Sequence, residues 1–62
     1  MPIIEVHLLE GRTAEQKREL AGKMTETVCQ TLGTRPEQVR IIFSEMRRED
    51  YAIAGRLVCD RD

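Results

Sequence analysis

The order of apolar patterns in the first 46 residues most constrains the fold of this chain. Apolar residues recur with a two-residue period over residues 3–9, and the same period returns over residues 38–46. Between them, over residues 14–32, apolar side chains mostly recur at helical spacings of three and four. Strand patterns on both sides of one amphipathic helix predict a βαβ unit, with parallel strands and a right-handed crossover.

Local signals mark both ends of the predicted helix. Thr13, with Gln16 three residues later, is typical of a capping box, and Gly33 is a typical residue at which a helix stops. Glu19 and Lys23 are spaced to form an ion pair on the polar face. The apolar stripe consists of Leu20, Ala21, Met24, Val28 and Leu32. This stripe is expected to pack on the two strands.

Both faces of the predicted sheet carry apolar residues. The face toward the helix holds Ile4, Val6 and Leu8 of the first strand and Val39, Ile41 and Phe43 of the second. The opposite face holds Ile3, Leu9, Ile42 and Met46. Two strands under one helix are not a stable sheet, and chains below about 70 residues need disulfides, a metal or oligomerisation to support a core. We therefore expect copies of the same chain to cover the second face.

The remaining segments are short. Residues 34–37 are expected to form a loop, and residues 47–50 a charged, solvated turn, from which Arg47 and Arg48 could help to attract an anion. Residues 51–57 are extended and suggest a short hairpin or an edge strand, and the last four residues are expected to fray. Because the sequence contains neither a linker nor a repeat, a single domain over residues 1–62 is expected.

Composition argues against several classes of function. Ten Lys and Arg against eleven Asp and Glu leave a net charge of −1, which gives no general attraction to nucleic acid or anionic lipid. No apolar run is long enough to span a membrane, and the N-terminus lacks the pattern of a signal peptide, so the cytoplasm is expected. Cys29 and Cys59 are expected to be reduced, and with a single His they cannot complete a zinc site.

Proline follows the initiator methionine and opens the first strand. Removal of Met1 would free a secondary amine at Pro2. In an apolar pocket beside arginines, desolvation and like charge would both lower the pKa of this amine toward neutrality, where a general base works best. The alternative is that Pro2 merely begins a strand, where its missing N–H does no harm.

Several segments together resemble the 4-oxalocrotonate tautomerase family. They are Pro2-Ile3-Ile4, the Leu8-Leu9-Glu10-Gly11-Arg12-Thr13 run, Glu15-Gln16-Lys17, Val39-Arg40-Ile41-Ile42 and Glu45-Met46. The resemblance runs without gaps from Pro2 to about Leu57. It implies an α/β (α+β) fold, a βαβ unit with a C-terminal β-hairpin. It also implies dimers with four-stranded sheets, three dimers in a hexamer, and no metal or organic cofactor.

The resemblance also implies roles for four residues. Pro2, freed of Met1, would carry a proton between two positions of a dienol acid. Arg12 would bind the distal carboxylate of the substrate, and Arg40 the carboxylate and oxygen at the reacting end. Tyr51 lies where the family archetype has a phenylalanine that packs against the proline. We expect more than one subunit to contribute to each site.

The expected function is therefore tautomerisation of a 2-hydroxymuconate-like dienol from aromatic catabolism. The segment Tyr51-Ala52-Ile53-Ala54-Gly55 departs from the archetype's Phe-Gly-Ile-Gly-Gly, which leaves the identity of the dicarboxylate or 2-oxo acid substrate open. Arg56 could approach the pocket from the hairpin, whereas His7 is expected at an interface or in solvent. Two alternatives are a dehalogenase or hydratase of unsaturated haloacids and a non-catalytic hexameric binding module.

Overall fold

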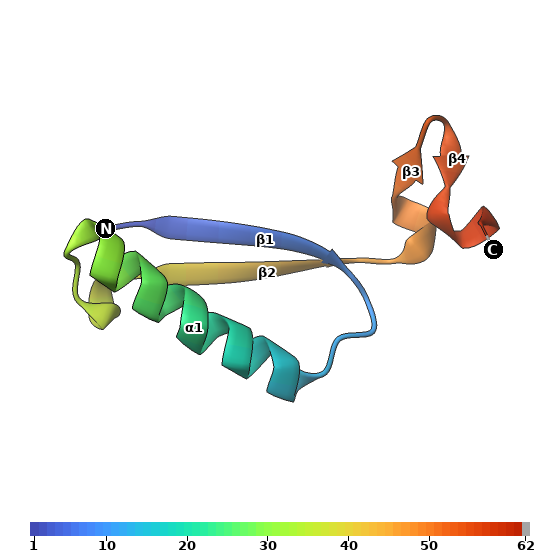
Figure 1. The fold of residues 1–62 in the computed structure, drawn as a ribbon. Coiled ribbons are helices and arrows are strands. Elements are labelled where there is room, and N and C mark those ends of the chain that lie inside the picture. The colour runs from blue at the N-terminus through green and yellow to red at the C-terminus, as the bar shows by residue number, and fades with distance from the viewer. Residues whose placement is uncertain (62) are drawn as a thin grey trace.

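The computed structural model describes residues 1–61 and confirms the order of strand, helix, strand and hairpin (Figure 1). The long elements are β1 (Ile3–Leu9), α1 (Ala14–Leu32) and β2 (Arg40–Met46), and the hairpin consists of β3 (Ala52–Ile53) and β4 (Arg56–Leu57). Three 3₁₀ helices, Pro36–Gln38, Arg48–Asp50 and Val58–Asp60, connect or follow them. The bounds of β1 and α1 are those expected from the sequence.

β1 and β2 form a parallel pair that is fixed at both ends. Ile3 lies opposite Arg40, and Leu9 lies opposite Met46. At the start of the pair the backbone N–H of Arg40 donates to the carbonyl of Pro2 at 3.0 Å. At its end the N–H of Glu10 donates to the carbonyl of Met46 at 2.9 Å. The starts of the two strands therefore share one edge of the sheet, and their ends share the other.

The expected caps fix both ends of α1. The N–H of Gln16 donates to Oγ1 of Thr13 at 3.1 Å, and the N–H of Thr13 donates to Oε1 of Gln16 at 3.0 Å. At the other end Gly33 has a φ of 73°, and its N–H donates to the carbonyl of Cys29 at 2.9 Å. These bonds satisfy backbone groups that a helix terminus otherwise leaves unpaired.

α1 covers the sheet face that was predicted, but two residues of its stripe differ. Lys17 of α1 forms an ion pair of 2.6 Å with Glu45, which shares a face of β2 with Ile41 and Phe43. The stripe residues Leu20 and Leu32 were expected in the core, yet they are 40% and 62% exposed. Two strands at a spacing of about 4.8 Å form a surface narrower than a helix of about 10 Å, so side chains at the edge of the stripe have nothing beneath them.

Two segment predictions are corrected. The second strand begins at Arg40 rather than at residue 38, because Pro36 starts a 3₁₀ helix at a position where its missing N–H costs nothing. The last four residues were expected to fray, but Cys59 and Asp60 belong to a 3₁₀ helix that starts at Val58, and the N–H of Arg61 donates to the carbonyl of Val58 at 3.1 Å. Asp62 lies outside the described residues.

The hairpin and the helices on either side of it form a small C-terminal arm, residues 47–61. Ala52 pairs with Leu57 in the hairpin. The N–H of Val58 donates to the carbonyl of Tyr51 at 2.8 Å, and a guanidinium nitrogen of Arg48 donates to the carbonyl of Val58 at 3.4 Å. The arm extends past the end of β2, away from α1 (Figure 1).

A single copy of the chain buries very little of its apolar surface. Among residues 1–61, Val58 is the only hydrophobic residue classed as buried, and Ile3 and Ile42 are 59% and 50% exposed on the sheet face opposite α1. The radius of gyration is 14.8 Å, whereas a compact domain of this length has about 11 Å. The sheet face opposite α1 is therefore uncovered in the isolated chain and exposes apolar residues among polar ones.

The hairpin turn holds an alanine in a conformation that favours glycine. Ala54 has a φ of 54° and Gly55 a φ of 80°, and these two residues join β3 to β4. Positive φ at both central residues is the geometry of a type I′ turn. An alanine in the left-handed region is strained by its Cβ atom.

We expect Ala54→Gly to stabilise the protein. Removal of the strain exceeds the extra freedom of glycine in the unfolded chain, so the gain is about 0.5–1 kcal/mol. Thermal unfolding at fixed protein concentration measures it as a rise in Tm. The same substitution in β3, Ala52→Gly, is the control and should lower Tm. A lower Tm for Ala54→Gly would contradict the assignment of strain.

Candidate active site

Pro2 and Arg40 lie side by side at the edge of the sheet where both strands begin. The backbone hydrogen bond between them places the start of one strand against the start of the other. Arg40 alternates with Ile41, so its side chain belongs to the sheet face opposite α1, as expected, and its guanidinium donates to the carbonyl of Glu37. Met1 is 74% exposed, so its removal would disturb little packing.

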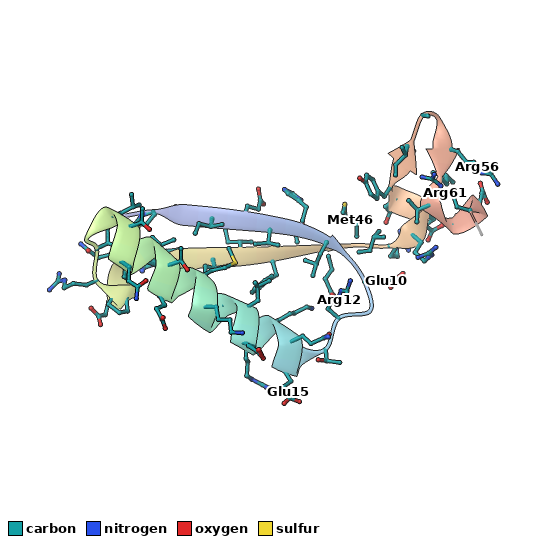
Figure 2. All side chains as sticks on the ribbon, in the orientation of Figure 1. Glu10, Arg12, Glu15, Met46, Arg56 and Arg61 are labelled. Carbon is teal, nitrogen blue, oxygen red and sulfur yellow. The ribbon has the colours of Figure 1, made fainter. Side chains whose placement is uncertain are left out.

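Arg12 lies at the other edge of the sheet, in the loop between β1 and α1. Gly11 in this loop has a φ of 117°, which residues other than glycine rarely adopt. Thr13 then caps the helix. Figure 2 shows Glu10 and Arg12 at this loop. A cavity of about 350 Å³ is lined by Leu8, Leu9, Glu10, Gly11, Arg12 and Arg48. We call it the Arg12 cavity.

The expected site residues therefore fall into two groups that do not meet within one chain. Pro2 and Arg40 flank the starts of the strands, whereas Arg12 follows the end of β1. The seven residues of β1 span about 20 Å at the usual rise of a strand. A reaction that uses both groups on one small molecule has to combine residues from two chains.

Tyr51 and Arg56 both belong to the C-terminal arm. Tyr51 is 41% exposed and immediately precedes β3, beyond the end of β2 and thus beyond the edge that carries Arg12. Arg56 donates from its guanidinium to the carbonyl of Asp60 at 2.6 Å. Figure 2 shows Arg56 on the arm. This contact gives Arg56 a structural role in the arm.

The remaining ionisable groups considered from the sequence make local contacts. Nε2 of His7 lies 3.3 Å from Oε1 of Glu5 on the exposed sheet face. Cys29 and Cys59 are both free. Desolvation and then the neighbouring Asp60 carboxylate raise the pKa of the exposed Cys59 thiol, so Cys59 stays protonated at neutral pH and is a poor nucleophile.

Within residues 1–61, no three or more His, Cys, Asp or Glu side chains lie close enough together to hold a metal ion. No helix within the same range combines the length and the apolar character needed to cross a membrane.

Comparison with known proteins identifies the family. The model of a family described as "Tautomerase enzyme" matches residues 2–61. The chain belongs to the tautomerase family. It is 45% identical over 62 residues to the 2-hydroxymuconate tautomerase of Bacillus subtilis, and the match covers 100% of both chains. The resemblance inferred from the sequence is thereby confirmed.

Solved structures of relatives have the same fold. A structure from the work on the 4-oxalocrotonate tautomerase isozymes of Methylibium petroleiphilum is 48% identical, covers 97% of this chain and 94% of its own, and has a TM-score of 0.92. One from the work on a heterohexameric 4-oxalocrotonate tautomerase of Chloroflexus aurantiacus is 26% identical, covers 100% of both chains and also has a TM-score of 0.92. The protein is thus a 4-oxalocrotonate tautomerase-like isomerase, which favours an enzyme over a non-catalytic binding module.

Sequence reasoning did not separate Arg48 from Arg47. Both were expected in a solvated turn from which they could help to attract an anion, and the structure places Arg48, but not Arg47, in the lining of the Arg12 cavity. The strand register contains the missing signal. Because Leu9 pairs with Met46, the residues that follow β2 lie next to those that follow β1.

Proposed function

We propose that this tautomerase converts a 2-hydroxymuconate-like dienol into the conjugated 2-oxo-enoate, with Pro2 as the proton carrier after removal of Met1. The observation that supports it most directly is the hydrogen-bonded pairing of Pro2 with Arg40 at one edge of the sheet. The Arg12 cavity at the other edge offers a cationic site for a second carboxylate. The name of the Bacillus subtilis relative, 2-hydroxymuconate tautomerase, agrees with this substrate class.

The proposed reaction moves one proton and one set of π electrons. The neutral amine of Pro2 takes the proton of the 2-hydroxyl group, and the O–H electron pair forms the carbonyl at C2. The double bonds shift along the chain, and the prolyl ammonium returns the proton to C5. The product is an isomer of the substrate, so the balance needs no co-reactant.

Two arginines would complete this chemistry. Arg40 would bind the carboxylate and oxygen at the reacting end and stabilise the charge that develops there during proton transfer. Arg12 would hold the distal carboxylate through charge-assisted hydrogen bonds. Tyr51 would form part of the pocket wall, where its hydroxyl makes the wall more polar than a phenylalanine would.

The proposed assembly follows from the separation of the two groups. A two-fold axis that sets two sheets antiparallel would place the Pro2 edge of one copy beside the Arg12 edge of the other. The result would be a four-stranded sheet with two sites, and its apolar face, which includes Ile3 and Ile42, would still need a cover. Three such dimers in a hexamer would supply it, and the relative from Chloroflexus aurantiacus is described as a heterohexamer.

Sedimentation tests the assembly. At micromolar concentration the protein should sediment at six times the 7.2 kDa mass of the chain. Ile42→Arg should break the assembly, because it replaces an apolar side chain of the uncovered sheet face with a charge that the contact would have to bury, whereas Gln30→Arg on the exposed side of α1 should leave it intact. A folded, stable monomer of the unaltered chain would contradict the proposed assembly.

The two arginines should differ in their kinetic effect. Arg40→Ala should lower kcat by about 10²–10³, because Arg40 meets charge that develops only in the transition state. Arg12→Ala should mainly raise KM, because the distal carboxylate changes little during proton transfer. Ultraviolet assays with 2-hydroxymuconate measure both, with Arg18→Ala on the exposed face of α1 as control. If Arg12→Ala raised KM for a monocarboxylate analogue as much as it raised KM for 2-hydroxymuconate, the role of Arg12 would be contradicted.

Modification of the N-terminus tests Pro2 itself. Pro2→Ala keeps a primary amine in nearly the same place, so activity should fall but persist. A variant with an uncleavable residue before Pro2 turns the nitrogen into an amide and should be inactive, although it should still fold and assemble. For the trimmed protein, kcat/KM should rise with pH as the amine loses its proton. Full activity of the blocked variant would rule out the proline mechanism.

A further inference from the structure

Arg48 and Arg12 face one cavity although 35 residues lie between them in the chain. Arg12 belongs to the loop after β1, and Arg48 begins the 3₁₀ helix after β2. Parallel pairing brings these two segments to the same edge of the sheet, and the hydrogen bond from Glu10 to Met46 fixes them there. The shared cavity therefore follows from the strand register.

The arginines near this edge differ in their partners. The guanidinium of Arg47 is paired with Glu49 at 3.1 Å and with Asp50 at 2.9 Å. Over residues 1–61, no carboxylate lies within 4.0 Å of the guanidinium of Arg48 or of Arg12. Arg48 uses one nitrogen to donate to the carbonyl of Val58 at 3.4 Å. A guanidinium has five N–H donors, so most of those of Arg48 stay available for a ligand.

The charge of the cavity depends on Arg48. Glu10 lines the same cavity, so its carboxylate offsets the charge of Arg12. With Arg12 and Glu10 alone the lining would be neutral, and the carboxylate of Glu10 would repel an incoming anion. Arg48 adds a second guanidinium, so two cations face one anion and the lining carries a net positive charge.

We propose that Arg48 is a second binding residue for the distal carboxylate of the substrate, which acts with Arg12 and makes the enzyme selective for diacids over monoacids. This inference rests on the proposed function, because it assigns the Arg12 cavity to the distal end of the substrate. Leu8 and Leu9 in the same lining provide an apolar wall for the carbon chain that leads to this carboxylate.

Binding of unreactive probes to the Met-trimmed protein tests the proposal without turnover. Titration calorimetry compares adipate, a six-carbon diacid, with hexanoate, the matching monoacid. Arg48→Ala should lower the affinity for adipate about fivefold, which corresponds to the loss of one exposed charge pair of about 1 kcal/mol. The affinity for hexanoate should not change. Arg47→Ala removes the same charge from the neighbouring residue and should alter neither affinity.

Two further variants separate charge from structure. Arg48→Lys keeps the charge and should recover part of the lost adipate affinity. Glu10→Gln in the Arg48→Ala background removes the opposing carboxylate and should restore the affinity for adipate to about its original value. An unchanged ratio of adipate affinity to hexanoate affinity in Arg48→Ala would overturn the proposal. If both affinities fell by the same factor, Arg48 would have a structural role through its contact with Val58 instead.

Kinetics distinguish this inference from the proposed function. Arg48→Ala should raise KM for 2-hydroxymuconate about fivefold, leave kcat unchanged and leave both constants for the monoacid 2-hydroxypenta-2,4-dienoate unchanged. If the unaltered protein turns over neither acid while Arg48→Ala still weakens adipate, the proposed reaction fails and the diacid site remains. If the unaltered protein is active and Arg48→Ala matches it on both acids, only the role of Arg48 fails.

Discussion

Parallel pairing of β1 with β2 is the constraint on which the rest of the structure depends. It brings the two strand starts together, so Pro2 and Arg40 become neighbours although 37 residues lie between them in the chain. It also brings the two strand ends together, so the loop that carries Arg12 meets the segment that carries Arg48. An antiparallel pair would have placed the start of one strand beside the end of the other, and neither group of residues would have formed. The helix between the strands provides the crossover connection that a parallel pair requires.

The same pairing explains why one copy of the chain is incomplete in two respects. A two-stranded sheet can bury only the face that α1 covers, so Ile3 and Ile42 stay exposed on the other face. A strand of seven residues also holds Pro2 and Arg12 too far apart for one small substrate. In the proposed assembly, a second chain would both cover the exposed sheet face and bring the two groups of the proposed site together. A variant that weakens the contact between chains would then lower stability and activity together.

Sequence signals succeeded where a structure depends on neighbours within a few residues. The bounds of α1 were predicted correctly, because they depend on contacts between residues three or four positions apart. These contacts are the capping box of Thr13 with Gln16 and the bond from Gly33 to Cys29. The end of the chain was misjudged because its 3₁₀ helix starts at Val58, which a hydrogen bond across the arm joins to Tyr51. Leu20 and Leu32 were misjudged because periodicity gives the direction of a side chain but not the width of the sheet beneath it.

The site was predictable to a different extent. Pro2 stood out from its place directly after Met1, with a structural role as the alternative, whereas the roles of Arg12, Arg40 and Tyr51 came from a family resemblance. Periodicity supported only the direction of Arg40, away from α1. Arg48 could not be assigned to the Arg12 cavity in this way. Its place in the Arg12 cavity depends on the register between Leu9 and Met46, which no local pattern specifies.

Net charge is a poor guide to what this surface attracts. The chain carries −1 overall, which argues against attraction of a polyanion large enough to interact with the whole surface. A single carboxylate interacts mainly with charges within about 8 Å at physiological ionic strength, so the charge balance near its site decides whether it is attracted. At the edge where both strands end, two carboxylates, Glu49 and Asp50, pair with Arg47, so these three groups together carry −1. In the lining of the Arg12 cavity, Glu10 offsets only one of the two guanidiniums. An acidic chain can thus contain a cavity whose lining carries a net positive charge, because its acids and arginines are unevenly distributed.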